Sequence, residues 1–375
     1  MQCQEIGVYI HIPFCKQKCY YCDFISYCNK EHKIPQYIEE VKKEIKEKLS
    51  SNNYKISTIY IGGGTPSSID SKYIRDILQM EEITKNLKEK AEITIEVNPG
   101  TVTKEKLQDY KKAGINRLSI GLQETDNKLL KSIGRIHTFE EFMQTYIYAR
   151  KVGFLNINVD LIIGLPNQTI DNVESSLEKI CTINPEHISV YSLIVQEGTV
   201  LSKLIESGKS QLPSEELERK MYWFVKQILE EHGYIHYEIS NFAKENFYSR
   251  HNTDCWEQKV YLGFGVAAHS YIDKKRFSNT ESLEKYLKDR NSNIELHELQ
   301  EPEDEQNEFM LLNLRKIEGV SIQKFKEKFN LNPVNLYKEE LLSLTKNNLI
   351  TVDRNYIKLT NKGIDLANIV WEEFV

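Results

Sequence analysis

Residues 11–24 read HIPFCKQKCYYCDF and contain three cysteines, Cys15, Cys19 and Cys22, in the spacing CxxxCxxC. Thiolates are soft ligands, and several of them on one loop favour zinc or an iron–sulfur cluster. A structural zinc site needs four ligands, and no second Cys or His pair at zinc-finger spacing follows this loop closely. The motif therefore predicts a [4Fe-4S] cluster with one iron open to an external ligand. Zinc, or three cysteines without metal, is the alternative.

The remaining cysteines, Cys3, Cys28, Cys181 and Cys255, are scattered along the 375 residues. A secreted disulfide scaffold would be shorter and richer in cysteine, so this pattern favours a reducing compartment. We expect a cytoplasmic protein, because the N-terminus shows no secretory signal and no long apolar run occurs. The net charge of -6 argues against broad nucleic-acid binding.

Strand-like and helix-like segments alternate through the first two thirds of the chain. Segments rich in Ile and Val predict strands over residues 8–13, 57–61, 92–97, 117–122, 156–163 and 187–194. Helical spacing predicts helices over residues 36–49, 72–88, 104–112, 139–151 and 171–183. This alternation predicts a parallel sheet with right-handed crossovers. Six such units fall short of the eight in a full barrel, so we expect an α/β fold built on a partial (β/α)6 barrel.

The last third of the chain has a different pattern. A helix is predicted over residues 214–232, and periodicity is weak over residues 234–279. Helices predicted over residues 306–316, 322–329 and 334–347 precede two short strands, residues 349–352 and 356–359. Helices followed by a hairpin are typical of a small winged-helix-like domain. We therefore predict a core over residues 1–235, an extension over 236–299 and a winged-helix-like domain over 300–375.

Glycine or polar residues stand at or near the ends of four predicted strands. GGGTP occupies residues 62–66, Glu96 and Gln123 follow on the next two strands, and Asp160 lies in the strand after those. The carboxyl ends of strands in a parallel barrel face the active site, so we expect these residues to share one pocket. For each residue taken alone, a tight turn or a capping role is the alternative.

These motifs together resemble the oxygen-independent coproporphyrinogen oxidase family of radical S-adenosylmethionine (SAM) proteins. The strings YIHIPFC, GGGTP, IEVNP, NRLSIGLQ, DLIIGLP and HISVYSL follow the family's order, and the likeness extends from Val8 to about Ile272. The resemblance implies a radical SAM barrel in which SAM binds the open iron. It also implies that Tyr21 lies against the cluster and that SAM is held by Tyr9, Gly63, Gly64, Thr65, Glu96, Gln123, Arg135, Asp160 and Ile194.

That family has two main branches, a coproporphyrinogen III dehydrogenase and a heme chaperone, and three features favour the chaperone branch. The chain starts only a few residues before its first strand, where the dehydrogenase branch has a long arm. The cluster motif ends CDF, without the further cysteine that the dehydrogenase branch carries two residues on. The strings YEISNFA at residues 237–243 and RHN at 250–252 are similar to the chaperone branch's heme-binding region.

The chaperone branch favours HNxxYW, and this chain has HNTDCW at residues 251–256, with Cys255 in place of tyrosine. The resemblance implies that His251 is the axial heme ligand, since imidazole commonly ligates heme iron. Ligation by Cys255 stays open. A structural histidine beside a core tryptophan is the plain alternative for His251.

The resemblance implies three cofactors, namely a [4Fe-4S] cluster, SAM and heme. The implied function is to carry heme to acceptor proteins, including respiratory and membrane-associated ones, so a peripheral place at the membrane also fits. An electron donor would be needed if SAM is cleaved, and we assign no catalytic residue. Coproporphyrinogen III dehydrogenation is the alternative function. No nucleic acid is expected, since the wing-like tail has balanced charge and no basic stripe.

Overall fold

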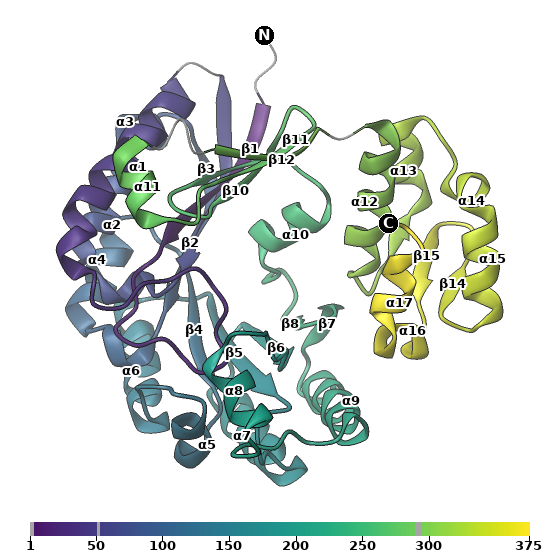
Figure 1. Ribbon diagram of the computed structural model, residues 1–375, viewed down its shortest axis with the longest axis horizontal. Coiled ribbons are helices and arrows are strands. Elements are labelled where there is room, and N and C mark those ends of the chain that lie inside the picture. The colour runs from purple at the N-terminus through teal and green to yellow at the C-terminus, as the bar shows by residue number, and fades with distance from the viewer. Residues whose placement is uncertain (1–3, 51–52, 290–293, 300) are drawn as a thin grey trace.

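The computed structural model describes residues 4–50, 53–289, 294–299 and 301–375, so Cys3 lies outside the described residues. Parallel strands paired in chain order form its centre. They are β1 Gln4–Ile12, β2 Tyr54–Gly63, β3 Leu87–Val97, β4 Arg117–Gln123, β5 Ile157–Ile163 and β6 His187–Ser192. Figure 1 shows them curving into an open barrel. The predicted α/β fold with a partial barrel is confirmed.

Helices cover the outer face of this barrel (Figure 1). They are α1 Ile34–Ser50, α2 Ser71–Leu78, α3 Glu81–Thr84, α4 Lys104–Lys112, α5 Asn127–Ser132, α6 Phe139–Val152, α7 Ile170–Ile183 and α9 Glu215–Glu231. Helix α8 Val200–Glu206 lies in front of the strands instead (Figure 1), where the Leu201 amide donates to the carbonyl oxygen of Tyr20 on the cysteine loop. Each long helix buries one apolar stripe, as α1 does with Tyr37, Val41 and Ile45. These stripes and the strands share one continuous core.

The helix predicted over residues 72–88 is wrong in its second half. Helix α2 ends at Leu78, and Met80 takes an extended conformation (φ -58°, ψ 141°) that breaks the helix before α3. Strand β3 then begins at Leu87, which pairs with Ile56 of β2. Helical spacing in the sequence continued through this break because Ile83 is also buried, on the separate short helix α3.

Residues 235–299 extend the same sheet at both edges. On one side, β7 Ile235–Glu238 and β8 Asn241–Ala243 add antiparallel strands beside β6. On the other side, β9 Tyr261–Phe264 pairs in parallel with β1, and β10 His269–Ile272, β11 Lys275–Asn279 and β12 Ile294–Leu299 follow. Helices α10 Arg250–Trp256 and α11 Leu283–Asp289 connect them. The result is one sheet of 12 strands. The domain boundaries at residues 235 and 299 stay predictions.

A smaller unit with its own core follows. It contains α12 Pro302–Leu314, β13 Val320–Ser321, α13 Ile322–Phe329, α14 Pro333–Leu336, α15 Lys338–Lys346, β14 Ile350–Val352, β15 Tyr356–Leu359, α16 Asn361–Asp365 and α17 Ala367–Glu372. The predicted hairpin is β14–β15, and β13 completes a three-stranded sheet. Phe309, Phe325 and Ile357 are central to its core.

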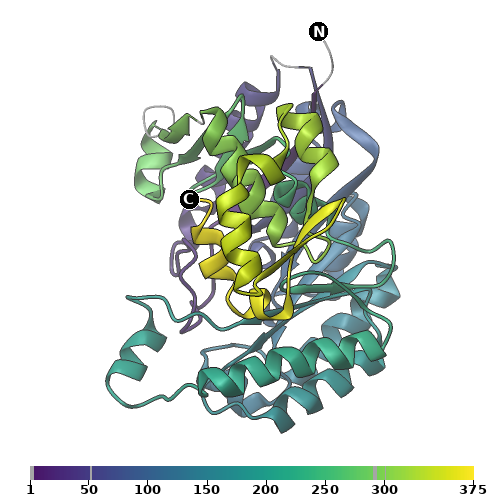
Figure 2. The same ribbon diagram turned by 90° about the vertical axis from the view of Figure 1, so that its right-hand side faces the viewer.

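The small unit lies beside the barrel, and α10 lies between the two in Figure 1; Figure 2 shows the unit in front of the barrel. Arg315 links them, because its guanidinium lies 4.5 Å from the ring of Trp256 and pairs with Glu238 at 3.5 Å. Within the described part of the chain, no helix is both long and apolar enough to cross a membrane.

Candidate functional site

The carboxyl ends of the parallel strands and the cysteine loop enclose a cavity of ≈ 400 Å³. This volume lies within the range of small-molecule sites. Every residue predicted for the cluster and for SAM lines the cavity, except Tyr9. His251 does not line it. The residues that line it are Cys15, Cys19, Tyr21, Cys22, Gly63, Gly64, Thr65, Glu96, Gln123, Arg135, Asp160 and Ile194.

The three predicted cluster cysteines lie on the loop that follows β1 and border one end of the cavity. The Sγ of Cys15 lies 3.3 Å from the Oγ1 of Thr65, and the Nη1 of Arg135 donates to the Sγ of Cys19 at 3.5 Å. Burial raises the pKa of Cys22 to about 11 and also raises that of Cys15. Cluster assembly must therefore displace protons from these thiols.

All three thiols of the cysteine loop border the same cavity. The guanidinium of Arg135 beside Cys19 supplies positive charge where an anionic cluster would lie.

Two glycines at the end of β2 let the backbone pass close to the cysteine loop. A Cβ on Gly64 would lie 3.0 Å from the Sγ of Cys15 and 3.1 Å from the carbonyl oxygen of Ile12. Gly63 has φ +112°, and a Cβ there would lie 2.6 Å from the ring of His11. Only glycine fits both positions without movement of His11 or of the cysteine loop.

Two half-buried carboxylates face the cavity. The carboxylate of Glu96 accepts hydrogen bonds from Tyr60 Oη at 3.0 Å and from the Gly63 amide at 3.2 Å. Asp160 accepts from Ser119 Oγ at 3.0 Å and from Asn158 Nδ2 at 2.7 Å. Burial, together with the nearby charge of Asp160, raises the pKa of Glu96 to about 7. Burial also raises the pKa of Asp160. A cationic ligand would stabilise both ionised forms.

Two further groups lining the cavity have unmet hydrogen-bonding capacity. Gln123 ends β4 with φ 74°, which is uncommon for a residue other than glycine. Its Oε1 and the Nε of Arg135 are buried without a hydrogen-bond partner among the described residues. Because such buried groups are nearly always satisfied in folded proteins, a polar ligand is the natural partner. The carboxylates and these groups together fit SAM, which carries a sulfonium, an amino acid and a nucleoside.

Tyr60 belongs to this site, although the sequence analysis did not select it. Its ring lines the cavity, and its hydroxyl orients Glu96. Side chains alternate along a strand, so the interior face shared by Thr58, Tyr60 and Gly62 was the signal that could have identified it. Tyr9 instead packs against Tyr60, with ring centroids 6.3 Å apart, and its Oη lies 3.0 Å from His11 Nδ1. The role of Tyr9 in SAM binding stays a prediction.

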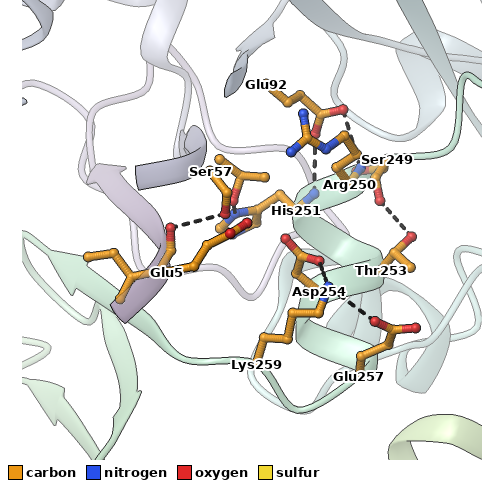
Figure 3. A network of polar contacts seen from close by, with 12 residues as sticks. Glu5, Ser57, Glu92, Ser249, Arg250, His251, Thr253, Asp254, Glu257 and Lys259 are labelled. Carbon is orange, nitrogen blue, oxygen red and sulfur yellow. Dashed lines mark hydrogen bonds and ion pairs between the residues drawn. The ribbon is translucent and has the colours of Figure 1, made fainter. Parts of the chain in front are cut away.

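His251 lies on α10 (Figure 3) and does not line the cavity. Its Nδ1 lies 2.9 Å from Thr58 Oγ1, and its ring stacks on Tyr60 with centroids 5.3 Å apart. Burial lowers its pKa to about 4, so the imidazole is neutral at physiological pH. The residue is only 6% exposed, so a porphyrin has no room beside the imidazole ring. Heme fits His251 only if α10 moves.

Cys255 lies on the same helix and is half-buried. Burial raises the pKa of its thiol to about 12. The thiolate that would ligate iron is therefore a minor form at neutral pH. Iron ligation by this thiol would have to displace its proton, as at the cluster cysteines.

The sequence of this chain also matches known protein families and individual proteins. Residues 9–180 match the radical SAM superfamily, and residues 300–366 match the HemN C-terminal domain. The chain is 37% identical to heme chaperone HemW of Lactococcus lactis, covering 98% of this chain and 97% of that protein. It is 36% identical to heme chaperone HemW of Bacillus subtilis, over 98% and 99%. A mitochondrial radical SAM domain-containing protein 1 of Danio rerio is 32% identical, over 98% and 86%.

A solved structure shares the whole architecture. Coproporphyrinogen III oxidase (HemN) from Escherichia coli superposes with a TM-score of 0.86 at 23% identity, covering 99% of this chain and 90% of that one. At this identity the likeness concerns the fold. Membership of the radical SAM superfamily implies a [4Fe-4S] cluster and SAM, as the cysteine motif predicted. The chain belongs to the radical SAM superfamily and, within it, to the family of the HemW proteins.

Proposed function

We propose that this protein is a heme chaperone, which binds heme and delivers it to acceptor proteins while carrying a [4Fe-4S] cluster and SAM. The observation that carries the proposal is the identity of 36–37% with proteins named heme chaperone HemW over 98% of this chain. The HNTDCW sequence at residues 251–256 supports it, because a neutral imidazole can ligate heme iron.

The residues of the cavity have separate roles in this proposal. Cys15, Cys19 and Cys22 hold the cluster, which supplies an electron for cleavage of SAM when a donor reduces it. Glu96 and Asp160 hold the cationic and hydroxyl groups of SAM. The remaining predicted contacts, which complete the SAM site, are Tyr9, Tyr21, Gly63, Gly64, Thr65, Gln123, Arg135 and Ile194.

Heme binds in this proposal at the segment that carries His251. The neutral imidazole has the correct protonation state for iron, but α10 must move before a porphyrin can approach. The proposed partners are heme-acceptor proteins, including membrane-associated respiratory ones, and an electron donor. A cytoplasmic location with peripheral contact at the membrane belongs to the same proposal.

A transfer assay tests the proposal. The anaerobically purified, cluster-loaded protein is loaded with hemin and mixed with apomyoglobin as a heme acceptor. We expect the Soret band of the loaded protein to be replaced by that of myoglobin. His251→Ala should lower loading, and Cys255→Ala should leave the Soret band in place. A band that shifts only in Cys255→Ala would assign the ligand to the thiolate, and hemin that never loads would contradict the chaperone function.

The alternative function is oxygen-independent dehydrogenation of coproporphyrinogen III. The likeness to HemN at 23% identity supports a common fold and does not favour that reaction over heme delivery. We therefore expect no decarboxylation of coproporphyrinogen III by this protein.

A further inference from the structure

A chain of buried hydrogen bonds runs from the SAM cavity through the barrel to the start of α10. The Ser249 amide donates to Tyr237 Oη at 3.2 Å, and Tyr237 Oη lies 2.8 Å from His187 Nε2. His187 Nδ1 lies 2.6 Å from Asn158 Oδ1, and Asn158 Nδ2 donates to Asp160 at 2.7 Å. Asp160 lines the cavity. The carbonyl oxygen of Asn158 can only accept, so His187 donates through Nδ1 and accepts from Tyr237 through Nε2.

All donors in this chain point the same way, from Ser249 toward Asp160. Hydrogen bonds aligned head to tail polarise one another, so a change at one end affects the others. Burial lowers the pKa of His187 well below its ordinary value, which keeps the ring neutral and preserves this direction. The carboxylate of Asp160 is the final acceptor, so its charge affects how firmly the chain holds Ser249.

A second, shorter route joins the same two places. Tyr60 donates to Glu96 at the cavity and stacks on the ring of His251 on its other side. The same His251 ring is held by Thr58. Among the described contacts, the Tyr60 ring alone therefore separates the Glu96 carboxylate at the cavity from His251, the proposed heme ligand.

Helix α10 depends on such contacts for its position. It has seven residues, and its first amides, those of Arg250 and His251, both donate to the Glu92 carboxylate at 3.2 Å (Figure 3). A helix this short has little stability of its own in water, so its docking rests on the barrel side chains that hold it. A change in those contacts shifts the balance between a docked and a released α10.

We propose that SAM in the cavity holds α10 docked, so that SAM occupancy and heme loading oppose each other. The part of this proposal that concerns heme loading rests on the function proposed above. A cationic ligand keeps Asp160 and Glu96 ionised, and a carboxylate accepts hydrogen bonds more strongly than a neutral acid does. Both routes then hold Ser249 and His251 more firmly. By linkage, heme bound to released α10 must weaken SAM binding by the same factor.

Hydrogen exchange tests the coupling without heme. The cluster-loaded protein is kept anaerobic and free of reductant, so that SAM stays intact, and exchange of the amides of residues 249–256 is followed by mass spectrometry. We expect SAM to slow this exchange in the wild type, and a Tyr60→Phe, Tyr237→Phe double variant to lose most of the effect. Tyr110→Phe is the matched control, because its buried hydroxyl has no hydrogen-bond partner among the described residues and belongs to neither route.

The outcomes separate the coupling from the proposed function. If calorimetry shows SAM bound and exchange of residues 249–256 does not change, or if the double variant keeps the full effect, the coupling is wrong. In a parallel hemin titration, we expect SAM to lower hemin affinity about fivefold or more, the lower end of typical couplings. Unchanged hemin affinity would also overturn the coupling. Exchange slowed by SAM in a protein that binds no hemin would uphold the coupling and refute the heme function.

Discussion

Among single residues, Glu96 has a raised pKa whose effect on SAM binding can be measured directly. Its pKa is raised to about 7 by burial and by Asp160. Because the pKa of Glu96 rises on folding, its protonated carboxyl stabilises the ligand-free fold at pH values below the unfolded pKa of 4.5. This contribution to the free energy of unfolding is lost as the pH rises through about 7. A cationic ligand favours the ionised form and offsets the loss. SAM should therefore stabilise the protein more at pH 8 than at pH 6.

The first prediction concerns this dependence. Calorimetry on the cluster-loaded protein should show SAM affinity rising between pH 6 and pH 8. Glu96→Gln should remove most of the rise and lower affinity at pH 8 about tenfold or more, since a hydrogen bond to a charged group is worth roughly 1.5–3 kcal/mol. Glu105→Gln, at an exposed position on α4, is the control. An equal pH slope in Glu96→Gln would refute the role assigned to this carboxylate.

A second prediction concerns the thiols. Anaerobic reconstitution should give about four irons and four sulfides per chain, as expected of a [4Fe-4S] cluster. Cys15→Ala, Cys19→Ala or Cys22→Ala should abolish the cluster, because each removes one of three protein ligands. Cys28→Ala and Cys181→Ala are the controls, since neither thiol lines the cavity. Stoichiometric zinc without iron absorption would contradict the cluster.

The sequence indicated those cavity-lining residues that belong to local motifs. The cysteine loop, GGGTP, Glu96 and Asp160 were found because each stands in a short string next to a strand end. The burial of His251 could not be predicted in the same way. It depends on contacts with Glu92 and Thr58, which are 159 and 193 residues away in the chain.

At the scale of elements, α10 is the part whose position matters most. The Glu92 carboxylate holds its first two amides, so Glu92→Gln should weaken docking by exchanging charged hydrogen bonds for neutral ones. We expect faster hydrogen exchange in residues 249–256 and faster hemin binding in stopped flow. Glu89→Gln, exposed on the same strand, is the control. Hemin binding that is as slow as in the wild type, despite faster exchange, would show that α10 does not limit access.

The elements themselves were predictable where they are long and periodic. The six parallel strands and helices α4, α6, α7 and α9 lie close to the residues that the sequence indicated. The strands β7 to β11 were not predicted, because each has only three to five residues, too few to show a clear period. Two of them, β8 and β9, also pair with distant segments. Strand β9, for instance, pairs Tyr261 with Gly7.

Across the whole molecule, Arg315 connects the small C-terminal unit to the barrel. It pairs with Glu238, which is 0% exposed, and stacks over Trp256 at the end of α10. Arg315→Ala should destabilise the protein by roughly 3 kcal/mol, the lower end for a broken buried pair because Arg315 is itself partly exposed, since the change leaves a buried carboxylate without its cation. Urea unfolding measures this loss, and adding Glu238→Gln should recover part of it. A double variant as unstable as the single one would mean that stacking, and not the charge, holds the units together.

One experiment tests the central claim most directly. The cluster-loaded wild type and His251→Ala are titrated anaerobically with hemin, and the same preparations receive coproporphyrinogen III, SAM and a reductant. We predict saturable binding of about one hemin per chain in the wild type, weaker binding in His251→Ala, and no protoporphyrinogen from either. Protoporphyrinogen formation without saturable hemin binding would contradict the chaperone account and assign the protein to the dehydrogenase reaction.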